Sequence, residues 1–137
     1  TLGGSTSLCV LMPKNGPRCA KETVRVEDLV DRPVISYRSE TPLGVLLQEE
    51  MRRQRVELPI SIRASCLDAY MLVANGAGVA LVDRLITQCR FYDSVVARPL
   101  EPLVSINIQI LTAPGTTTSR AQRQLIDTIT AAFREIS

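Results

Sequence analysis

Hydroxyl side chains gather at two points where a predicted strand gives way to a predicted helix. The first joint covers residues 36–41, Ser-Tyr-Arg-Ser-Glu-Thr, before Pro42, and the second is Ser65–Cys66. The first turn of a helix offers unpaired N–H groups and the positive end of the helix dipole, which favour an anion. Parallel strands end at one edge of their sheet, where α/β proteins hold ligands. The joints therefore predict a site for a carboxylate or another small anion, while Tyr37 and Arg38 either reach that ligand or form a solvated loop.

Both joints also have a purely structural interpretation. Thr41 precedes Pro42, a residue that suits the first position of a helix, and Thr41 is therefore a plausible N-cap. Ser65 stands three residues before Asp68, which is the spacing of a capping box. A single residue of this kind is more often only a cap, but two of them at one sheet edge make the ligand site an equal alternative.

The Cys66 thiol raises the question of an enzyme. A thiol at a helix N-terminus can have a lowered pKa, but nucleophilic catalysis also needs a base. The chain has no His, and Asp68, the nearest carboxylate, is already explained as part of the cap. We therefore predict that the chain is not an enzyme, with a Cys66 nucleophile as the alternative.

The four cysteines do not form a metal-binding or disulfide pattern. There is no Cys-x-x-Cys and no His, so neither a metal site nor a cofactor is expected. Cys9 and Cys89 lie among apolar residues and are predicted to be packing residues. Unpaired cysteines indicate a reducing compartment, which together with the lack of a signal-peptide pattern predicts a cytoplasmic protein.

Composition narrows the class of protein further. The chain of 137 residues is 45% hydrophobic, has 4% aromatic residues and no Trp, and is long enough for one domain or two small lobes with an aliphatic α/β core. The net charge of +2, with both signs interspersed, gives no electrostatic footprint for nucleic acid. No apolar run approaches the length of a membrane span.

Hydrophobic periodicity and turn signals predict strands that alternate with helices and end in two successive strands and a helix, an α/β sheet with at least one parallel crossover. Residues 1–6 are expected to be a flexible leader, and Asn15-Gly16-Pro17 is a turn signal. The predicted strands are residues 7–13, 34–36, 60–64, 79–82, 94–97 and 104–110, and the predicted helices are residues 26–30, 42–54, 65–77, 83–89 and 119–136. Residues 98–102 are expected to be an extended connector.

Apolar stripes indicate which helix faces are buried. The stripe of the helix over residues 42–54 is Leu43, Leu46, Leu47 and Met51, with Glu49, Glu50, Arg52 and Arg53 outside. The stripe of the next helix is Leu67, Tyr70, Met71, Ala74 and Ala77, and Gly76 or Gly78 ends it. The final helix has a capping box in Ser119 and Gln122 and a stripe of Leu125, Ile129, Ala132, Phe133 and Ile136.

Several of these segments, in this order, resemble LysR-type transcriptional regulators. They are Leu8-Cys-Val-Leu-Met-Pro13 with the turn after it, residues 26–36, the segment Leu72-Val-Ala-Asn-Gly-Ala-Gly-Val-Ala-Leu-Val82 and residues 96–100. The resemblance covers about residues 7–135. It implies a type 2 periplasmic-binding-protein-like fold, an α/β mixed sheet flanked by helices, with a small-molecule effector held between two lobes.

The same resemblance assigns parts of the chain to lobes and effector contacts. Residues 7–13 would be a hinge strand of the first lobe, residues 14–101 the second effector-binding lobe, and residues 102–137 the return strand and C-terminal helix of the first lobe. Family effector contacts correspond here to Ser36, Ser39, Glu40, Thr41, Pro42, Ser65 and Cys66.

The chain departs from the family pattern at its N-terminal side. Nothing in this sequence corresponds to the DNA-binding helix-turn-helix or to most of the first lobe, so we expect an incomplete two-lobe fold that does not itself bind DNA. The apolar stripes of residues 42–54 and 120–133 lose their first-lobe partners, which predicts self-association. The alternative function is a solute-binding protein of a transport system with the same fold.

Overall fold

The computed structural model describes residues 2–16 and 20–136, and it divides the chain into two units. Leu8–Val104 form one unit, called here the sheet unit, and Thr1–Ser7 with Ser105–Ser137 form the other, called the terminal unit. Pro17 and Cys19, which belong to the predicted turn and the cysteine set, lie outside the described residues. The lobe boundaries expected from the resemblance remain a prediction.

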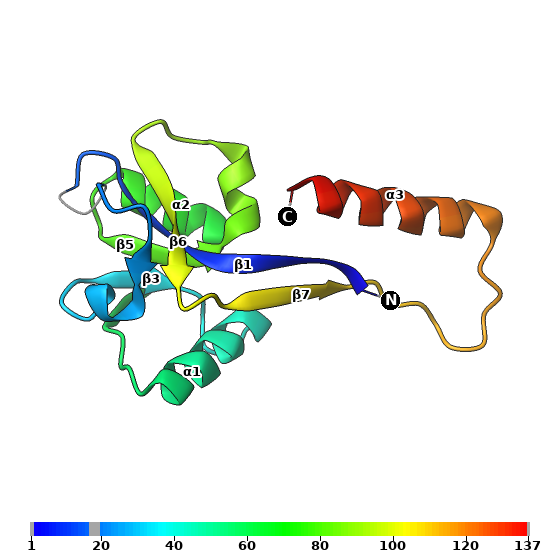
Figure 1. Ribbon diagram of the computed structural model, residues 1–137, viewed down its shortest axis with the longest axis horizontal. Coiled ribbons are helices and arrows are strands. Elements are labelled where there is room, and N and C mark those ends of the chain that lie inside the picture. Colours follow the sequence, from blue (N-terminus) through cyan, green and yellow to red (C-terminus); the bar gives the residue numbers. More distant parts are fainter. Residues whose placement is uncertain (1, 17–19, 137) are drawn as a thin grey trace. The chain divides into compact units, whose positions relative to one another are not determined.

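Figure 1 labels the main elements. The strands are β1 (Leu2–Pro13), β2 (Val24–Arg25), β3 (Val34–Ser36), β4 (Ile60–Arg63), β5 (Val79–Asp83), β6 (Val95–Glu101) and β7 (Ser105–Gln109). The helices are α1 (Pro42–Gln54), α2 (Cys66–Ala74) and α3 (Arg120–Ile136), with short 3-10 helices η1 (Val26–Leu29) and η2 (Arg84–Cys89). The predicted strand order along the chain is confirmed, except that β2 was not expected and β6 continues through the predicted connector to Glu101.

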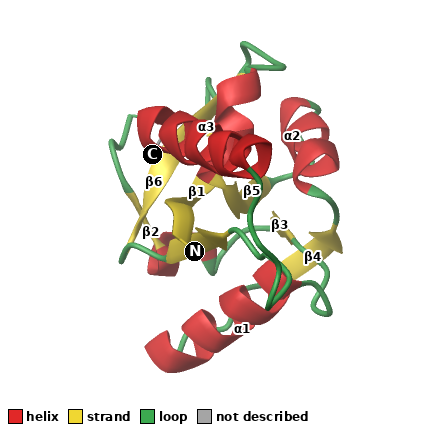
Figure 2. Cartoon of the chain, turned by 90° about the vertical axis from the view of Figure 1, so that its right-hand side faces the viewer, coloured by secondary structure: helices red, strands yellow, loops and turns green. Residues whose placement is uncertain are grey.

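The sheet unit is built on a mixed sheet with the order β2-β6-β1-β5-β3-β4, as the predicted fold class requires. β3 pairs in parallel with both β4 and β5, whereas β1 is antiparallel to β5 and β6. Helix α1 connects β3 to the edge strand β4, and α2 then connects β4 back to β5 on the other side of β3. Figures 1 and 2 show α1 and α2 on opposite faces of the sheet, as right-handed crossovers in these two directions require.

The core of this unit follows from its central strands. Val79–Val82 of β5 are all buried, because β5 lies between β1 and β3 and is covered on both faces. The facing residues Leu8–Met12 of β1 and Val34–Ile35 of β3 are buried as well. The prediction of a strand buried on both faces is therefore confirmed.

Helix α1 begins and ends where the sequence predicts, but one of its charged residues is not outside. Leu47 and Met51 are buried as expected, and so is Glu50, which is only 8% exposed. Its carboxylate accepts hydrogen bonds from Gln54 Nε2 at 2.6 Å and from the Arg53 guanidinium. These neighbouring donors compensate the burial of the charge, a pairing that amphipathic periodicity alone does not reveal.

Helix α2 buries a different face from the predicted one. Ala69, Tyr70 and Val73 are buried, whereas Leu67 and Met71 are 52% and 46% exposed. Nearly every residue of this helix is apolar, so periodicity does not distinguish one face from another.

The predicted end of α2 is confirmed at Gly76, which has φ +81°. Ala77 N–H donates to Leu72 O at 3.0 Å and Gly76 N–H donates to Val73 O at 3.1 Å, which is a Schellman motif. Gly78 serves close packing instead, because a Cβ there would lie 2.6 Å from Pro33 O.

The terminal unit contains the first part of β1, together with β7 and α3. Residues 1–6 were expected to be a flexible leader, but β1 begins at Leu2 and pairs antiparallel with β7, with Gly4 opposite Ile108 and Thr6 opposite Ile106. The expectation failed because the partner strand lies about a hundred residues away in the sequence, and composition reports only local preference. β7 alternates between exposed and half-buried residues as predicted.

Helix α3 has the predicted N-terminus. Ser119 N–H donates to Gln122 Oε1 at 2.8 Å and Gln122 N–H donates to Ser119 Oγ at 3.2 Å, which confirms the capping box. None of the described residues of α3 is buried, and Leu125 of its apolar stripe is 59% exposed.

Candidate functional site

The two hydroxyl-rich joints lie side by side at one sheet edge. Ser36, the last residue of β3, is in register with Arg63, the last residue of β4. Ala64 N–H donates to Ser36 O at 2.9 Å, which ties the two strand ends together. The starts of α1 and α2 therefore follow directly from adjacent parallel strands, and this arrangement places both helix N-termini near one edge.

At the first joint, Thr41 is the N-cap of α1 as predicted. Its Oγ1 accepts from Gly44 N–H at 3.1 Å and donates to Arg38 O at 2.7 Å. A Cβ on Gly44 would lie 2.0 Å from Arg38 O, so only glycine lets the helix approach the loop this closely. The exposed Pro42 occupies the first helical position.

The charged residues of this loop neutralise one another. Glu40 Oε1 accepts from Arg38 Nε at 2.6 Å, and Ser39 Oγ donates to Glu40 Oε2 at 3.4 Å. The pKa of Glu40 is lowered by its own backbone N–H and then by the Arg38 guanidinium. Ser39 and Glu40 are thus held by local bonds, and the loop presents no isolated negative charge.

At the second joint, Ser65 is the N-cap of α2, but the cap differs from the predicted capping box. Ser65 Oγ accepts from Asp68 N–H at 3.2 Å, as expected. The Asp68 carboxylate accepts from Ser65 Oγ at 2.9 Å, whereas it was predicted to reach the backbone N–H of the cap residue. The short Asp side chain reaches the nearer hydroxyl, while the longer Glu or Gln of a capping box spans to the backbone.

Cys66 is half-buried at the first position of α2, and its pKa is raised rather than lowered. Burial is the main cause, and the negative charge of Asp83 adds to it. These two effects outweigh the helix N-terminus, so the thiol is protonated at neutral pH and the nucleophile alternative loses its chemical basis.

Tyr37 and Asp83 form a link that sequence reasoning missed. The Tyr37 hydroxyl donates to Asp83 Oδ2 at 2.7 Å and accepts from Asp83 N–H at 2.8 Å. Tyr37 is buried, so the solvated-loop alternative is wrong for it, and burial followed by the bond to Asp83 raises its pKa. The link fastens the end of β3 to the end of β5, and no local signal connects residues 46 positions apart.

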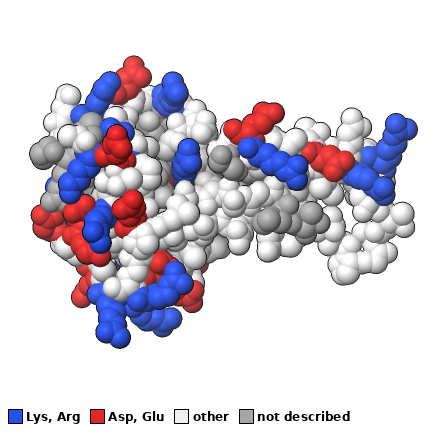
Figure 3. Space-filling view, viewed as in Figure 1, with Lys and Arg blue, Asp and Glu red and all other residues white. Residues whose placement is uncertain are grey.

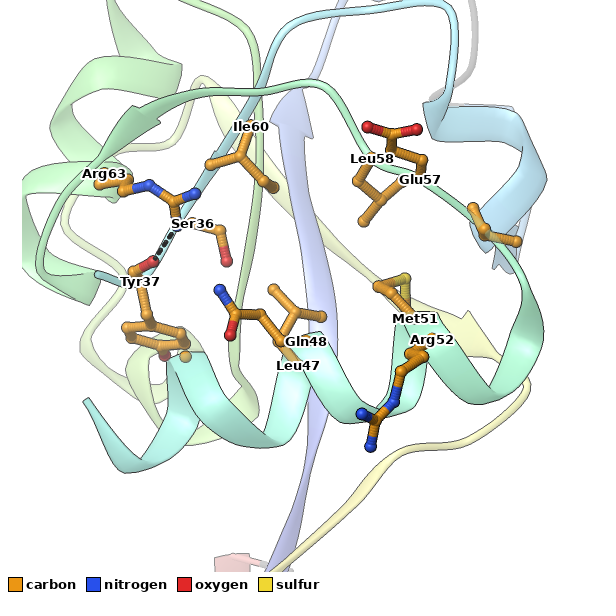
Figure 4. Close-up of a pocket in the computed structure, with 12 residues that line it drawn as sticks. Ser36, Tyr37, Leu47, Gln48, Met51, Arg52, Glu57, Leu58, Ile60 and Arg63 are labelled. Carbon is orange, nitrogen blue, oxygen red and sulfur yellow. Dashed lines mark hydrogen bonds between the residues drawn. The ribbon is translucent and has the colours of Figure 1, made fainter. Parts of the chain in front are cut away.

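Ser36 is the one predicted site residue that is fully buried, and it lines a cavity of about 380 Å³ between α1 and β4. Its Oγ donates to Leu81 O at 3.4 Å. Figure 4 shows Arg63 and Gln48 beside Ser36 on the same side of this cavity. Neither Arg63 nor Gln48 was among the predicted residues, although an Arg at the last position of a strand before a hydroxyl-rich joint is a usable signal.

The surface around these elements carries mixed charge. Figure 3 shows basic and acidic side chains interspersed over the face in view, with no large patch of one sign. Among the described residues there is no group of three or more acidic or Cys side chains placed to hold a metal ion. No described helix has the length and apolar character needed to cross a membrane.

Three solved structures that this chain resembles are a regulator or a domain of one. The regulatory domain of CcmR from Synechocystis PCC6803, solved in complex with 2-PG, matches 99% of this chain and 67% of its own length, with a TM-score of 0.75 and 13% identity. HinK, a LysR family transcriptional regulator from Pseudomonas aeruginosa, matches 97% of this chain with a TM-score of 0.78 and 15% identity. The effector binding domain of QuiR in complex with shikimate covers 98% of this chain, with 64% of its own length matched, a TM-score of 0.72 and 13% identity.

At these identities the likeness shows the fold, and the chain spans about half the length of HinK, 47%. Comparison with curated protein sequences finds no match. The family model of the LysR substrate binding domain matches residues 2–134, which confirms the predicted resemblance and favours a regulator over a transport-type solute-binding protein. The chain therefore belongs to the LysR substrate-binding domain family.

Proposed function

We propose that this effector-binding domain holds a small, anionic molecule at the carboxyl ends of β3 and β4. The observation that supports this is the bond from Ala64 N–H to Ser36 O, which keeps the N-termini of α1 and α2 at one sheet edge. Two helix N-termini at one edge add their dipoles and their unpaired first-turn N–H groups. The contact residues are the predicted set: Ser36, Ser39, Glu40, Thr41, Pro42, Ser65 and Cys66.

The class of ligand follows from the donors at this edge. Hydroxyls of Thr41 and Ser65 and first-turn N–H groups are hydrogen-bond partners for carboxylate oxygens. Asp68 opposes an anion at the second joint, which favours a ligand whose charge lies nearer α1. Two structural neighbours were solved with small molecules, 2-PG and shikimate, which supports a small-molecule effector.

In the whole regulator we propose that this ligand is enclosed in a cleft between two lobes. Closure of the cleft would shift the population of a dimer between states, and DNA binding would belong to an N-terminal helix-turn-helix. The protein would act in the cytoplasm, without catalysis.

The test separates capping from ligand binding. Thr41→Ala and Ser65→Ala each remove one cap, and we expect each to cost about 1 kcal/mol of unfolding free energy. Calorimetric titration with a panel of small carboxylates, shikimate and benzoate among them, should also show weaker binding by both variants. The control is Ser119→Ala, which removes the cap of α3 and should leave affinity unchanged. If all three variants bind the carboxylates as tightly as the wild type, Thr41 and Ser65 act only as helix caps and do not contact a ligand.

We also propose that the chain self-associates through the apolar stripe of α3. Leu125 of this helix is 59% exposed and Ile129 is 36% exposed, so part of the apolar face is open to a partner.

A further inference from the structure

We propose that the sheet unit holds a second ligand site, in the cavity between α1 and β4, which binds a small organic anion with an apolar body. The cavity measures about 380 Å³ and lies within one unit. Its volume falls in the range of small-molecule pockets. Of the predicted contact residues only Ser36 lines it, so the proposal does not rest on the ligand at the helix N-termini.

One end of the cavity carries polar groups that lack full hydrogen bonding. The Arg63 guanidinium makes one long bond, from Nη1 to Tyr37 O at 3.4 Å, and the Gln48 amide has no hydrogen-bond partner among the described residues. Figure 4 shows the guanidinium and the amide beside Ser36, whose own hydroxyl is engaged with Leu81 O. Together these groups supply donors and one positive charge, the combination that binds a carboxylate.

The other end is apolar. Met51 of α1 faces Leu58 across the cavity, and Leu47 and Ile60 form the wall between the two ends. These side chains offer a surface for a hydrocarbon or aromatic group, whose burial there gains free energy in proportion to the area removed from water.

The positive and negative side chains near the cavity lie at opposite ends, with the positive charge at the polar end. Glu57 lies at the apolar end, opposite Arg63, and the Arg52 side chain extends away from the space between α1 and β4 (Figure 4). An anionic group is therefore attracted to the Arg63 end and repelled from the Glu57 end, so the site orients its ligand. A neutral apolar molecule would lack this attraction.

Octanoate, a carboxylate with an apolar tail, is the probe, and 1-octanol is its uncharged counterpart. We expect the chain to bind octanoate at least about tenfold more tightly than octanol, because one charge-assisted hydrogen bond contributes that much or more. In an NMR titration the shifted amides should lie in residues 47–52 and 57–63. Arg63→Gln and the isosteric Gln48→Glu should each weaken octanoate binding about tenfold and leave octanol unchanged.

Both substituted residues are exposed, so the variants should fold. Arg123→Gln removes an exposed guanidinium from α3 and should not alter octanoate affinity. Thr41→Ala and Ser65→Ala should leave the octanoate-induced shifts of residues 47–52 and 57–63 unchanged, which separates this site from the one at the helix N-termini. The proposal is overturned if octanol binds as tightly, if Thr41→Ala abolishes the octanoate-induced shifts of residues 47–52 and 57–63, or if the shifts fall on α3. It is equally overturned if octanoate does not bind and Arg63→Gln changes the sedimentation of the chain, because the cavity would then be a protein interface.

Discussion

The two units of the chain differ in how their apolar residues are used. In the sheet unit, β1, β3 and β5 bury large side chains completely, and Leu81, Leu11 and Val10 have no exposed surface. In the terminal unit, α3 has an apolar stripe that is just as regular, yet none of its described residues is buried. An amphipathic pattern shows which face of a helix needs a partner, but it does not show that the same chain supplies that partner.

This difference separates stability from association. The buried core of the sheet unit supports the strand ends at which we place both proposed sites, so ligand binding and folding depend on the same residues. The exposed stripe of α3 contributes little to folding of the isolated chain and offers a surface for other molecules.

The largest expected difference between the two units is the loss of unfolding free energy when one leucine in each unit is shortened to alanine. Leu81→Ala removes a fully buried side chain, and we expect it to cost about 3 kcal/mol of unfolding free energy because it leaves a cavity. Leu125→Ala removes the same atoms from a side chain that is 59% exposed and should cost less than about 0.5 kcal/mol. Urea denaturation of both variants gives the two values, and similar costs would show that α3 is packed.

The pH dependence of the unfolding free energy should also show that the Cys9 thiol is buried in the core. Burial, reinforced by the charge of Asp83, raises the pKa of Cys9 from 9.0 to about 12, so the folded chain favours the neutral thiol. The unfolded chain ionises first, so stability is full below about pH 9 and is lost as the pH rises toward the folded pKa. At about pH 10 the expected loss is about 1.4 kcal/mol.

Denaturation between about pH 8 and pH 10 measures this loss, and Cys9→Ala should flatten the curve. The control Cys66→Ser changes a thiol that is half-exposed and should flatten it less. An identical slope for wild type and Cys9→Ala would mean that Cys9 is accessible to water.

Association is expected to depend on α3 alone. Leu125→Glu places a charge in the apolar stripe and should weaken self-association about tenfold, because burying an unpaired carboxylate is costly. Gln124→Glu adds the same charge at the neighbouring exposed position and serves as the control. Sedimentation over a range of concentrations measures both, and a monomer mass at every concentration of the wild type would contradict the proposed association.

Local patterns predicted the parts of the fold that depend on neighbouring residues. The caps of α1 and α3, the glycine end of α2 and the buried run of β5 are all confirmed, because each needs only a few consecutive residues. The adjacency of the two joints also followed from the sequence, since parallel strands must end at the same edge.

Most of the misses involve partners that are distant in the sequence or faces that composition does not distinguish. The first residues of β1 pair with β7, and Tyr37 bonds to Asp83; neither partner is visible locally. The face of α2 was misassigned because nearly all of its residues are apolar. Gln48 and Arg63 meet at the cavity only because α1 packs beside β4, which is a consequence of tertiary packing.

The most direct test of the proposed effector site is amide hydrogen exchange of the whole chain with and without small carboxylates. The account predicts that a bound carboxylate slows exchange of the first-turn amides of α1 and α2, residues 43–45 and 66–69, and leaves α3 unchanged. If only one helix start is protected, the anion binds at a single helix N-terminus, and the other joint serves only as a helix cap. Protection confined to α3, or binding that protects neither helix start, would contradict the claim that the two joints form the effector site.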